Sequence, residues 1–452
     1  NNHQIFRLLP EYDFPAWRGF LDHLGASMHP SWHFGYFDRD AYPLAMSANC
    51  ELIRSGAGPL PFWVTELQGG SNNYSGMNPL TPTATEIAQW VWTSIASGAR
   101  GLIFWTLNPR SVGFEAGEWG MIDWQGQPTD RLEMAGRITA CLAAHPGLAQ
   151  ARPQFDPIHL LYSSETMALQ DLWEMDGGDV RQTFAARQSG GHIKSLLAHY
   201  QAMLESGITP QIAGLHEFDW ENHGRDHTLI LPNMTVLPRA YHQPLRDYVA
   251  RGGKLVLTGQ SGHLDEYRYN TFQGDAPLAE LLGGHLLELR VQGDRFETRV
   301  EGQPLLAHYL QGVIEPATGA IAGEAPNGTV TALRHTYGQG ETLWVPAPLG
   351  LAVWGESSPA LAAFWRREVS LPSQPVRLAG HYPGLMIRQL QAGNTTYTVL
   401  VQTDSPARTL RFDAPGLRPE VVFQSGAGQI LDKRSVHLGP ASVLVLRWAA
   451  KE

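Results

Sequence analysis

The chain has 452 residues, of which 43% are hydrophobic and 17% charged, so it can bury a sizeable core and its composition argues against disorder. Its formal net charge of -10, with no cluster of Lys and Arg, argues against nucleic acid or an anionic membrane as a partner. Only two cysteines, Cys50 and Cys141, are present, which excludes a CxxC zinc framework and a disulfide lattice. No apolar run of about 18 residues is present, so nothing is expected to span a membrane.

The sequence starts with Asn1, and its opening residues match neither a signal peptide nor a transit peptide. We expect a processed or truncated N-terminus, so that the chain begins inside something larger. These residues do not determine the compartment, although a cytoplasmic one is favoured.

Helix and strand patterns alternate in the first third of the chain. The expected helices are 13–23, 40–56, 87–99 and 129–144, and the expected strands are 24–32, 61–66 and 101–105. Strands that alternate with helices predict a parallel β/α architecture. A closed (β/α)8 barrel needs eight such units and about 250 residues, so residues 1–150 cannot close a barrel by themselves.

One carboxylate stands at the end of the strand expected at 61–66. Five mostly apolar residues lead into Glu66, and a Gly/Asn-rich loop that reaches Tyr74 follows at once. A buried parallel strand that ends on a charged residue delivers that group to the carboxyl edge of a sheet, where the catalytic residues of barrels lie. From the strand alone, a structural ion pair or a cap of the following turn is an equal alternative.

The pattern changes twice after residue 150. Residues 151–372 show strands and helices in alternation, including strands near 158–162, 227–231 and 254–258, which predicts a flavodoxin-like open α/β sheet. Residues 373–452 are all strand and turn, which predicts a small antiparallel β-sandwich. The expected fold class is therefore α/β, with an incomplete barrel, an open sheet and a sandwich in that order.

Several motifs of the first and second segments together resemble a known family. They are Phe62-Trp-Val-Thr-Glu66-Leu-Gln-Gly, Gly98-Ala-Arg-Gly-Leu-Ile-Phe-Trp105, Asn108-Pro-Arg110, Gly113-Phe-Glu115 and Arg251-Gly-Gly-Lys-Leu-Val-Leu-Thr258. The first four resemble the second half of the barrel of glycoside hydrolase family 42, the β-galactosidases, at about strands 6–8. The second segment resembles that family's trimerisation domain, and the tail resembles its C-terminal β domain.

The resemblance implies roles for five residues. Glu66 corresponds to the catalytic nucleophile of a retaining mechanism that passes through a glycosyl-enzyme intermediate. Tyr74 stands where the family carries a Trp that lines the sugar site, and Trp105 belongs to the end of the eighth strand. Glu115 matches a ligand of substrate hydroxyls, whereas Glu118 stands where family members commonly have His, which puts the preference for galactose in question.

Two features of the family have no counterpart here. The acid/base of the family lies in an Asn-Glu pair at the end of the fourth strand, and no residue of this chain corresponds to it. Glu11 precedes the sixth-strand region and is interpreted as a loop or helix-start carboxylate, while Glu115 or Glu118 as the acid is the less favoured alternative. The cysteine zinc cluster of the family is also missing, and we expect neither a metal nor a cofactor.

Other motifs are assigned structural roles. The stretch from Gly259 to His263 follows a strand but misses the Gly-x-Ser-x-Gly spacing of a nucleophile elbow, so a turn is expected. The pair His192 and His199, and the stretch His263–Glu266, are expected to have surface or capping roles, because they lack the strict spacing that metals need. The Trp90/Trp92 helix is expected to belong to the core.

Two functions remain as hypotheses. The first is the C-terminal portion of a retaining, exo-acting β-glycosidase, most simply a β-galactosidase, whose N-terminal half is a separate or cleaved chain that supplies strands one to five and the acid. The second is a non-catalytic assembly or sugar-binding subunit with a vestigial half-barrel. Both imply a carbohydrate ligand, and the family resemblance implies a homotrimer.

Overall fold

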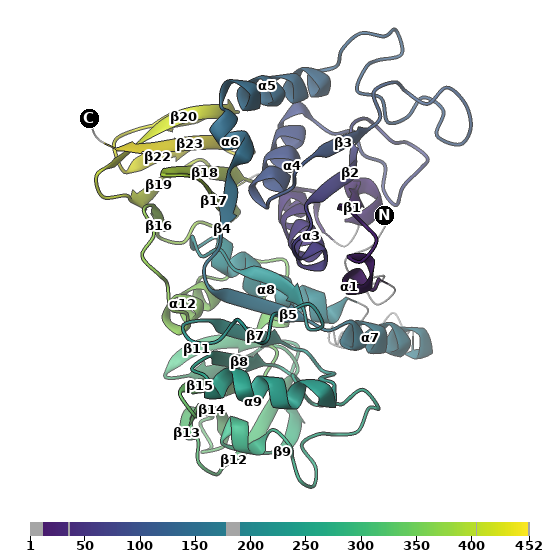
Figure 1. The fold of residues 1–452 in the computed structure, drawn as a ribbon. Helices are drawn as coiled ribbons and strands as arrows, with labels where there is room; N and C mark the ends of the chain where they lie inside the picture. Colours follow the sequence, from purple (N-terminus) through teal and green to yellow (C-terminus); the bar gives the residue numbers. More distant parts are fainter. Residues whose placement is uncertain (1–11, 35–36, 178–189, 404, 451–452) are drawn as a thin grey trace.

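The computed structural model describes residues 12–34, 37–177, 190–403 and 405–450 of the chain (Figure 1). Three parts follow one another: a small parallel sheet with its helices, a larger mixed sheet, and a pair of antiparallel sheets. One hydrophobic cluster contains buried residues of all three parts, so the parts pack on a shared core. Among the described residues, no helix combines the length and the apolar character needed to cross a bilayer.

The first part is a three-stranded parallel sheet in the order β1-β2-β3. Its strands are β1 (Leu24–Met28), β2 (Phe62–Gln68) and β3 (Leu102–Trp105). The helices α3 (Tyr42–Ala57) and α4 (Ala84–Ala96) connect the strands and pack against each other. The alternation of strand and helix expected from the sequence is confirmed here.

The first helix and the first strand are both shorter than the sequence predicts. The helix expected at 13–23 is reduced to α1 (Phe14–Trp17), and the strand expected at 24–32 stops at Met28, where α2 (Pro30–His33) begins. Pro30 has no N–H to donate to a neighbouring strand, and its fixed φ suits the first position of a helix. The chain therefore turns away from the sheet immediately after β1.

The start of α4 and the end of α3 follow from local chemistry. The Thr83 hydroxyl accepts a hydrogen bond from the Glu86 N–H at 3.2 Å, and Glu86 accepts one from the Thr83 N–H at 2.8 Å, which forms a capping box. The end of α3 is Gly58, whose φ of +59° suits a residue without a Cβ. The end of α3 thus directs the chain into β2, and the capping box starts α4 after the loop that follows β2.

The small sheet has two open edges among the described residues, because β1 and β3 each pair only with β2. On β3, Ile103 is 51% exposed. The helix α5 (Asp130–Ala144) packs on α4, and a groove of about 290 Å³, lined mostly by apolar side chains, lies between α4, α5 and β3. An open strand edge beside apolar surface is a pairing site that soluble folds normally cover.

The second part is a seven-stranded sheet in the order β13-β14-β15-β8-β7-β5-β6. Its strands are β5 (Ile158–Tyr162), β6 (Gln211–Gly214), β7 (Thr228–Pro232), β8 (Lys254–Thr258), β13 (Ala320–Glu324), β14 (Val330–Tyr337) and β15 (Gly340–Val345). The five parallel strands lie in the order 2-1-3-4-5 of the chain, which is the flavodoxin-like order. Its longer helices are α7 (Ser164–Gly177), α8 (Gly191–Leu204), α9 (His242–Ala250) and α12 (Pro359–Glu368).

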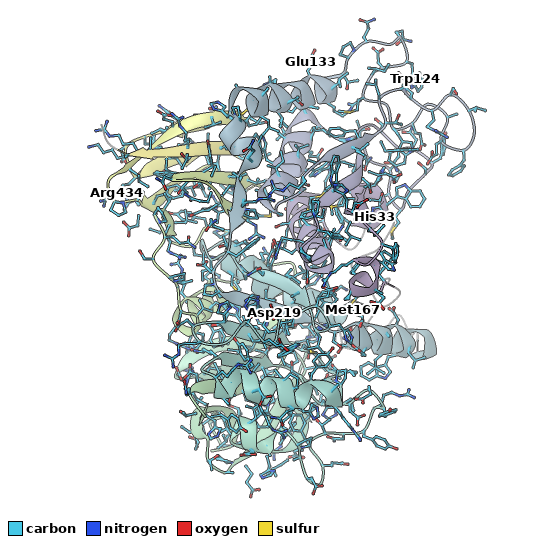
Figure 2. The ribbon with its side chains drawn as sticks, in the orientation of Figure 1. His33, Trp124, Glu133, Met167, Asp219 and Arg434 are labelled. Carbon is cyan, nitrogen blue, oxygen red and sulfur yellow. The ribbon has the colours of Figure 1, made fainter. Side chains whose placement is uncertain are left out.

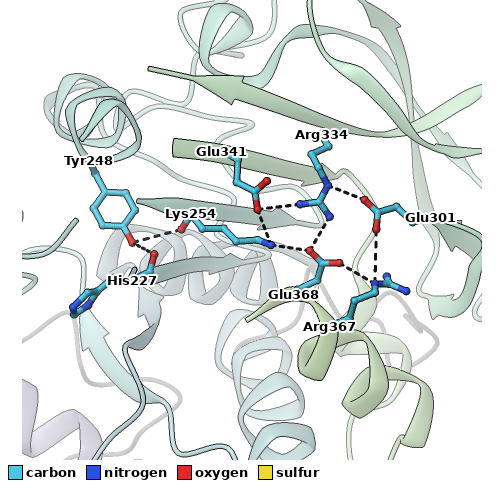
Figure 3. Close-up of polar contacts among 8 residues, drawn as sticks. All are labelled: His227, Tyr248, Lys254, Glu301, Arg334, Glu341, Arg367 and Glu368. Atoms are coloured by element: carbon cyan, nitrogen blue, oxygen red, sulfur yellow. Dashed lines mark hydrogen bonds and ion pairs between the residues drawn. The ribbon is translucent and has the colours of Figure 1, made fainter. Parts of the chain in front are cut away.

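A network of charged side chains joins α12 to this sheet (Figure 3). Glu368 is buried and accepts from Lys254 at 3.0 Å, from Arg334 at 2.8 Å and from Arg367 at 3.2 Å. Glu341 contacts the same Lys254 and Arg334 at 2.8 and 3.2 Å. The network thus connects the end of a helix to three neighbouring strands.

The third part consists of two antiparallel sheets, as expected for a β-sandwich. One has the order β20-β23-β18-β17-β4 and the other β16-β19-β22-β21, with β4 (Arg152–Gln154), β16 (Arg377–Ala379), β17 (Leu385–Ala392), β18 (Thr395–Gln402), β19 (Arg408–Asp413), β20 (Leu417–Ser425), β21 (Gly428–Ile430), β22 (Ser435–Leu438) and β23 (Val443–Ala450). Strand β4 lies in the expected α/β segment but pairs with β17. The first residues after 150 therefore belong to the sheet of the last part.

A buried polar cluster lies where the three parts meet. Arg388 of β17 donates to Glu51 of α3 at 3.2 Å and to the hydroxyl of Tyr200 of α8. The Tyr200 hydroxyl also shares a hydrogen bond with Ser47 at 2.8 Å, and Arg54 donates to Glu51 at 2.5 Å. Because Arg388 of β17 contacts both α3 and α8, this cluster links one element of each part.

Candidate active site

Glu66 lies near the carboxyl end of β2, in the middle strand of the small sheet. The pairing with β1 shifts between Ala26 and Ser27, so that β2 carries one extra residue and Ser27 stands opposite Glu66. Such a bulge re-aims the side chains beside it. The Glu66 side chain remains 38% exposed, so a ligand can reach it.

Two side chains of the neighbouring strand end contact this carboxylate. The Ser27 hydroxyl donates to Glu66 Oε2 at 2.7 Å, and His29 Nε2 lies 3.6 Å from the same oxygen. Interaction with His29 lowers the pKa of Glu66 most strongly. Burial raises this pKa, but the hydrogen bond from Ser27 lowers it further, and the result is a pKa of about 2. The carboxylate is therefore ionised at neutral pH, which is the state that a nucleophile requires.

The loop after β2 is held by buried amide side chains. Gln68 donates to the Asn72 side-chain oxygen at 3.1 Å, and the same oxygen accepts from the Leu80 N–H at 3.1 Å. At Gly70 the backbone approaches the backbone of Gly120 so closely that a Cβ would lie 2.3 Å from its carbonyl oxygen. The loops after β2 and β3 are thus packed directly on each other.

Glu118 is buried and bonded to the loop that follows β2. Its side chain is fully buried, and one of its oxygens accepts from the N–H groups of Asn73 and Tyr74 at 2.8 and 2.7 Å while the other accepts from the Ser75 hydroxyl. Burial alone raises the pKa of Glu118, but these donors outweigh it and lower the pKa. This environment favours a role in holding the loop 73–75 over the sugar contact implied by the family resemblance.

The other three predicted residues, Tyr74, Trp105 and Glu115, lie at or after the carboxyl ends of β2 and β3 and reach the surface. Tyr74 is 77% exposed, while Trp105 and Glu115 are half-buried. The guanidinium group of Arg110 lies 5.5 Å from the centroid of the Trp105 ring and 3.7 Å from a Glu115 oxygen. Figure 2 shows the loop that follows β3 reaching away from the body of the molecule around Trp124, which is also exposed.

Sequence reasoning missed Ser27, His29 and Arg110 as parts of the site. The sequence did contain a signal for His29. It is a polar residue that directly follows the apolar residues of β1, just as Glu66 follows the apolar residues of β2. The His29 ring also packs edge-on against the buried Trp119, at a centroid distance of 5.2 Å. Pairing of Ser27 with Glu66 depends on the bulge, which leaves no sequence signal.

Glu11 lies outside the residues that the structure describes. The histidines considered as metal ligands are in the core rather than at the surface: His192 bonds the Ser163 N–H and the Pro232 carbonyl, and the ring of His199 accepts from Trp365. Burial lowers the pKa of His192 to about 4 and that of His199 to about 3. Their nitrogens are used by the fold, so the surface role expected for them is wrong while the structural role is right.

The fold and this edge define a protein of the α/β class, in which functional side chains lie at the carboxyl ends of parallel strands. The family model described as β-galactosidase, glycoside hydrolase family 42, matches residues 3–140, and that family's β-galactosidase trimerisation domain matches residues 160–355. The chain belongs to glycoside hydrolase family 42, as its sequence motifs predict.

Individual relatives agree with the family. β-Galactosidase BgaH of Haloferax lucentense is 22% identical over 350 residues, which are 75% of this chain and 49% of BgaH. The solved structure of Gan42B, a family 42 β-galactosidase from G. stearothermophilus, aligns with a TM-score of 0.77 and 18% identity over 98% of this chain and 62% of that chain. The β-galactosidase from Halorubrum lacusprofundi aligns with a TM-score of 0.71 and 18% identity over 98% and 63%.

At these identities the solved structures show a shared fold. The chain spans about half the length of the curated relative and less than two thirds of the solved ones. The structural alignments cover 98% of this chain, and therefore include strands β1 to β3, the open sheet and the sandwich.

Proposed function

We propose that the chain is the C-terminal portion of a retaining, exo-acting β-glycosidase, with terminal β-D-galactosides as its substrates. The observation that carries the proposal is the ionised Glu66 at the carboxyl end of β2, held by Ser27 and His29. A carboxylate there attacks the anomeric carbon and forms a glycosyl-enzyme intermediate, which water then hydrolyses. The relatives named as β-galactosidases support the choice of sugar.

The acid/base of this reaction comes from outside the chain in our proposal. In the described part of the chain, the polar side chains that contact the Glu66 carboxylate are Ser27 and His29. Both oxygens of Glu118 are engaged by groups of residues 73–75. A retaining mechanism needs a second carboxyl group about 5 Å from the nucleophile. An N-terminal half, as a separate or cleaved chain or as part of one longer polypeptide, would carry it.

The site itself supports completion by more protein. Strands β1 and β3 have open edges in the described part of the chain, and Ile103 faces outward. The Nδ1 atom of His29, the hydroxyl of Thr65 and the indole N–H of Trp119 are buried without a hydrogen-bond partner. Buried polar atoms are normally paired, so further strands or a bound sugar would supply their partners.

In this reading Tyr74 and Trp105 offer aromatic faces to the sugar, and Glu115 accepts hydrogen bonds from its hydroxyls. Arg110 positions both Trp105 and Glu115. The match to a trimerisation domain supports a homotrimer as the assembled form.

The test is hydrolysis of nitrophenyl β-galactoside, β-fucoside and α-L-arabinopyranoside by the assembled protein, with and without its N-terminal half. We expect Glu66→Gln to lower kcat by at least about 1,000-fold. Glu133→Gln, which changes an exposed carboxylate on α5, should leave kcat within twofold. Full activity of Glu66→Gln would refute the catalytic assignment, and sugar binding without turnover by the complete assembly would favour the binding-subunit alternative.

A further inference from the structure

Three histidines gather in the second part of the chain, away from the candidate active site. One side-chain nitrogen from each of His159, His223 and His227 lies within 4.8 Å of the others. His159 Nε2 and His227 Nδ1 are 3.0 Å apart, and the His223 ring lies 4.6 and 4.8 Å from the other two ring centroids. We infer that these imidazoles form a binding site for a divalent transition-metal ion of the Zn²⁺ type.

The fold itself brings the three side chains together. His159 is the second residue of β5, and His227 immediately precedes β7, the parallel neighbour of β5. His223 belongs to the connection between β6 and β7. The Phe218 ring packs against both His159 and His223, with centroid distances of 5.1 Å.

The backbone of His227 is anchored separately from its ring. Its carbonyl accepts a hydrogen bond from the Tyr248 hydroxyl at 2.8 Å, which Figure 3 shows beside the charged network of Lys254. The imidazole is therefore available to face His159, at the end of the sheet where the parallel strands begin.

The chemistry of the cluster suits a cation. Imidazole binds zinc in its neutral form. The carboxylates of Asp219 and Asp226 act electrostatically on His223 and His227, and a nearby negative charge favours a bound cation.

The spacing also suits a metal. A Zn–N distance of about 2.0 Å in a tetrahedral site corresponds to about 3.3 Å between ligand nitrogens. His159 Nε2 and His227 Nδ1 share a hydrogen bond at 3.0 Å, so an ion would displace the proton between them and move the two nitrogens slightly apart. His223 is half-buried on a connecting loop, so a small rotation brings its nitrogen within reach, and the fourth position is left for water.

The position of the site indicates a structural ion. Open α/β sheets bind their substrates at the carboxyl ends of the strands. His159 and His227 lie at the amino ends of β5 and β7, so an ion there would tie the β6–β7 connection to the sheet. Its effect should therefore appear in stability rather than in glycoside hydrolysis.

The experiment is a titration of the metal-free full protein with Zn²⁺ by calorimetry, and with Co²⁺ by visible absorption, at pH 7.5. We expect one Zn²⁺ per chain, the intense d–d bands of four-coordinate Co²⁺, and a Tm that rises with added Zn²⁺. His223→Ala and His227→Ala should each weaken binding by more than about 100-fold and abolish the rise in Tm. His285→Ala, at an exposed histidine of strand β9 (Gly284–Val291), is the matched control and should bind as the wild type does.

No binding of Zn²⁺ by the wild type at 100-fold molar excess would overturn the inference. Unchanged binding in either His223→Ala or His227→Ala would do so as well, because the ion would then lie elsewhere. A circular dichroism spectrum and the metal-free Tm of each variant show whether it folds, which separates loss of a ligand from loss of structure. Since the readouts are metal binding and Tm, failure of this test leaves the proposed glycosidase untouched.

Discussion

Two glutamates three positions apart on one loop show how much the environment decides a residue's task. Glu115 is half-buried, and its carboxylate lies 3.7 Å from the guanidinium group of Arg110. Glu118 is fully buried and accepts from two backbone N–H groups and the Ser75 hydroxyl. The residue types are identical, but only Glu115 has oxygens free to meet a ligand.

We therefore predict opposite effects of the same substitution. Glu118→Gln replaces an acceptor oxygen by an NH₂ group that faces donors, so it should destabilise the protein by about 2 kcal/mol and lower its Tm. Glu115→Gln should leave Tm unchanged and lower kcat/KM for the galactoside by about tenfold. Thermal unfolding and steady-state kinetics of both variants check this, and a stable Glu118→Gln with raised KM would return Glu118 to the substrate contacts.

The site around Glu66 also shows what a residue-level prediction can reach. The strand end was enough to single out Glu66 as a candidate, and the family resemblance added Tyr74. The contact of Ser27 with Glu66 was out of reach, because it results from one extra residue in β2 that shifts the pairing. The burial of Glu118 was out of reach for a similar reason, since the donors come from a loop more than forty positions earlier.

Among the elements, helix α12 is attached to the large sheet through the buried carboxylate of Glu368. Burial alone would raise the pKa of Glu368, but hydrogen bonds and charge from Arg334 and Lys254 lower it below its usual 4.5. The folded state therefore releases this proton more readily than the unfolded state does. The stabilisation is complete above about pH 4.5 and is lost as the pH falls through the lowered pKa.

Glu368→Gln should destabilise the protein by about 2 kcal/mol at pH 7, because three cations, Lys254, Arg334 and Arg367, lose a buried carboxylate partner. The loss of stability between pH 7 and pH 3 should also be smaller in the variant than in the wild type. Glu356→Gln is the matched control, since Glu356 pairs with Arg295 at the surface and such pairs contribute about 0.5 kcal/mol. Equal Tm-against-pH curves for the wild type and Glu368→Gln would contradict the prediction.

Element types followed from the sequence where the pattern was long. The apolar spacing in α3 and α4 and the apolar runs of β5, β7 and β8 predicted these elements within a few residues. Helix α12 begins at Pro359, because the Ser358 side chain caps it and Pro suits the first position of a helix. Helix α7 was not predicted, since its apolar residues lack a clear period.

At the scale of the whole molecule, the three parts meet at the cluster of Glu51, Arg388 and Tyr200. Arg388→Met should remove the cation between them and leave buried acceptors unpaired, which destabilises the protein by about 3 kcal/mol. Arg434→Met, at an exposed position of the sandwich, should change stability by less than about 0.5 kcal/mol. Chemical denaturation of both variants measures the difference, and equal midpoints would mean that the cluster adds nothing to the contact between the parts.

The sequence by itself determined the order of the three parts, the family, and the candidate carboxylate at the end of β2. Each of these depends on local features: the period of apolar residues, turn chemistry, and motifs of consecutive residues. A local pattern survives folding because neighbouring residues stay neighbours.

Only the tertiary structure decided which groups surround each side chain. It paired β4 with the last sheet, placed Glu118 inside a loop, set Ser27 and His29 against Glu66, and brought His223 and His227 to His159. His223 and His227 are four residues apart in the chain, and their grouping became apparent only because β5 places the imidazole of His159 beside them. Contacts of this kind join residues that are distant in the chain, and they are set by strand register and packing, which no single stretch of sequence contains.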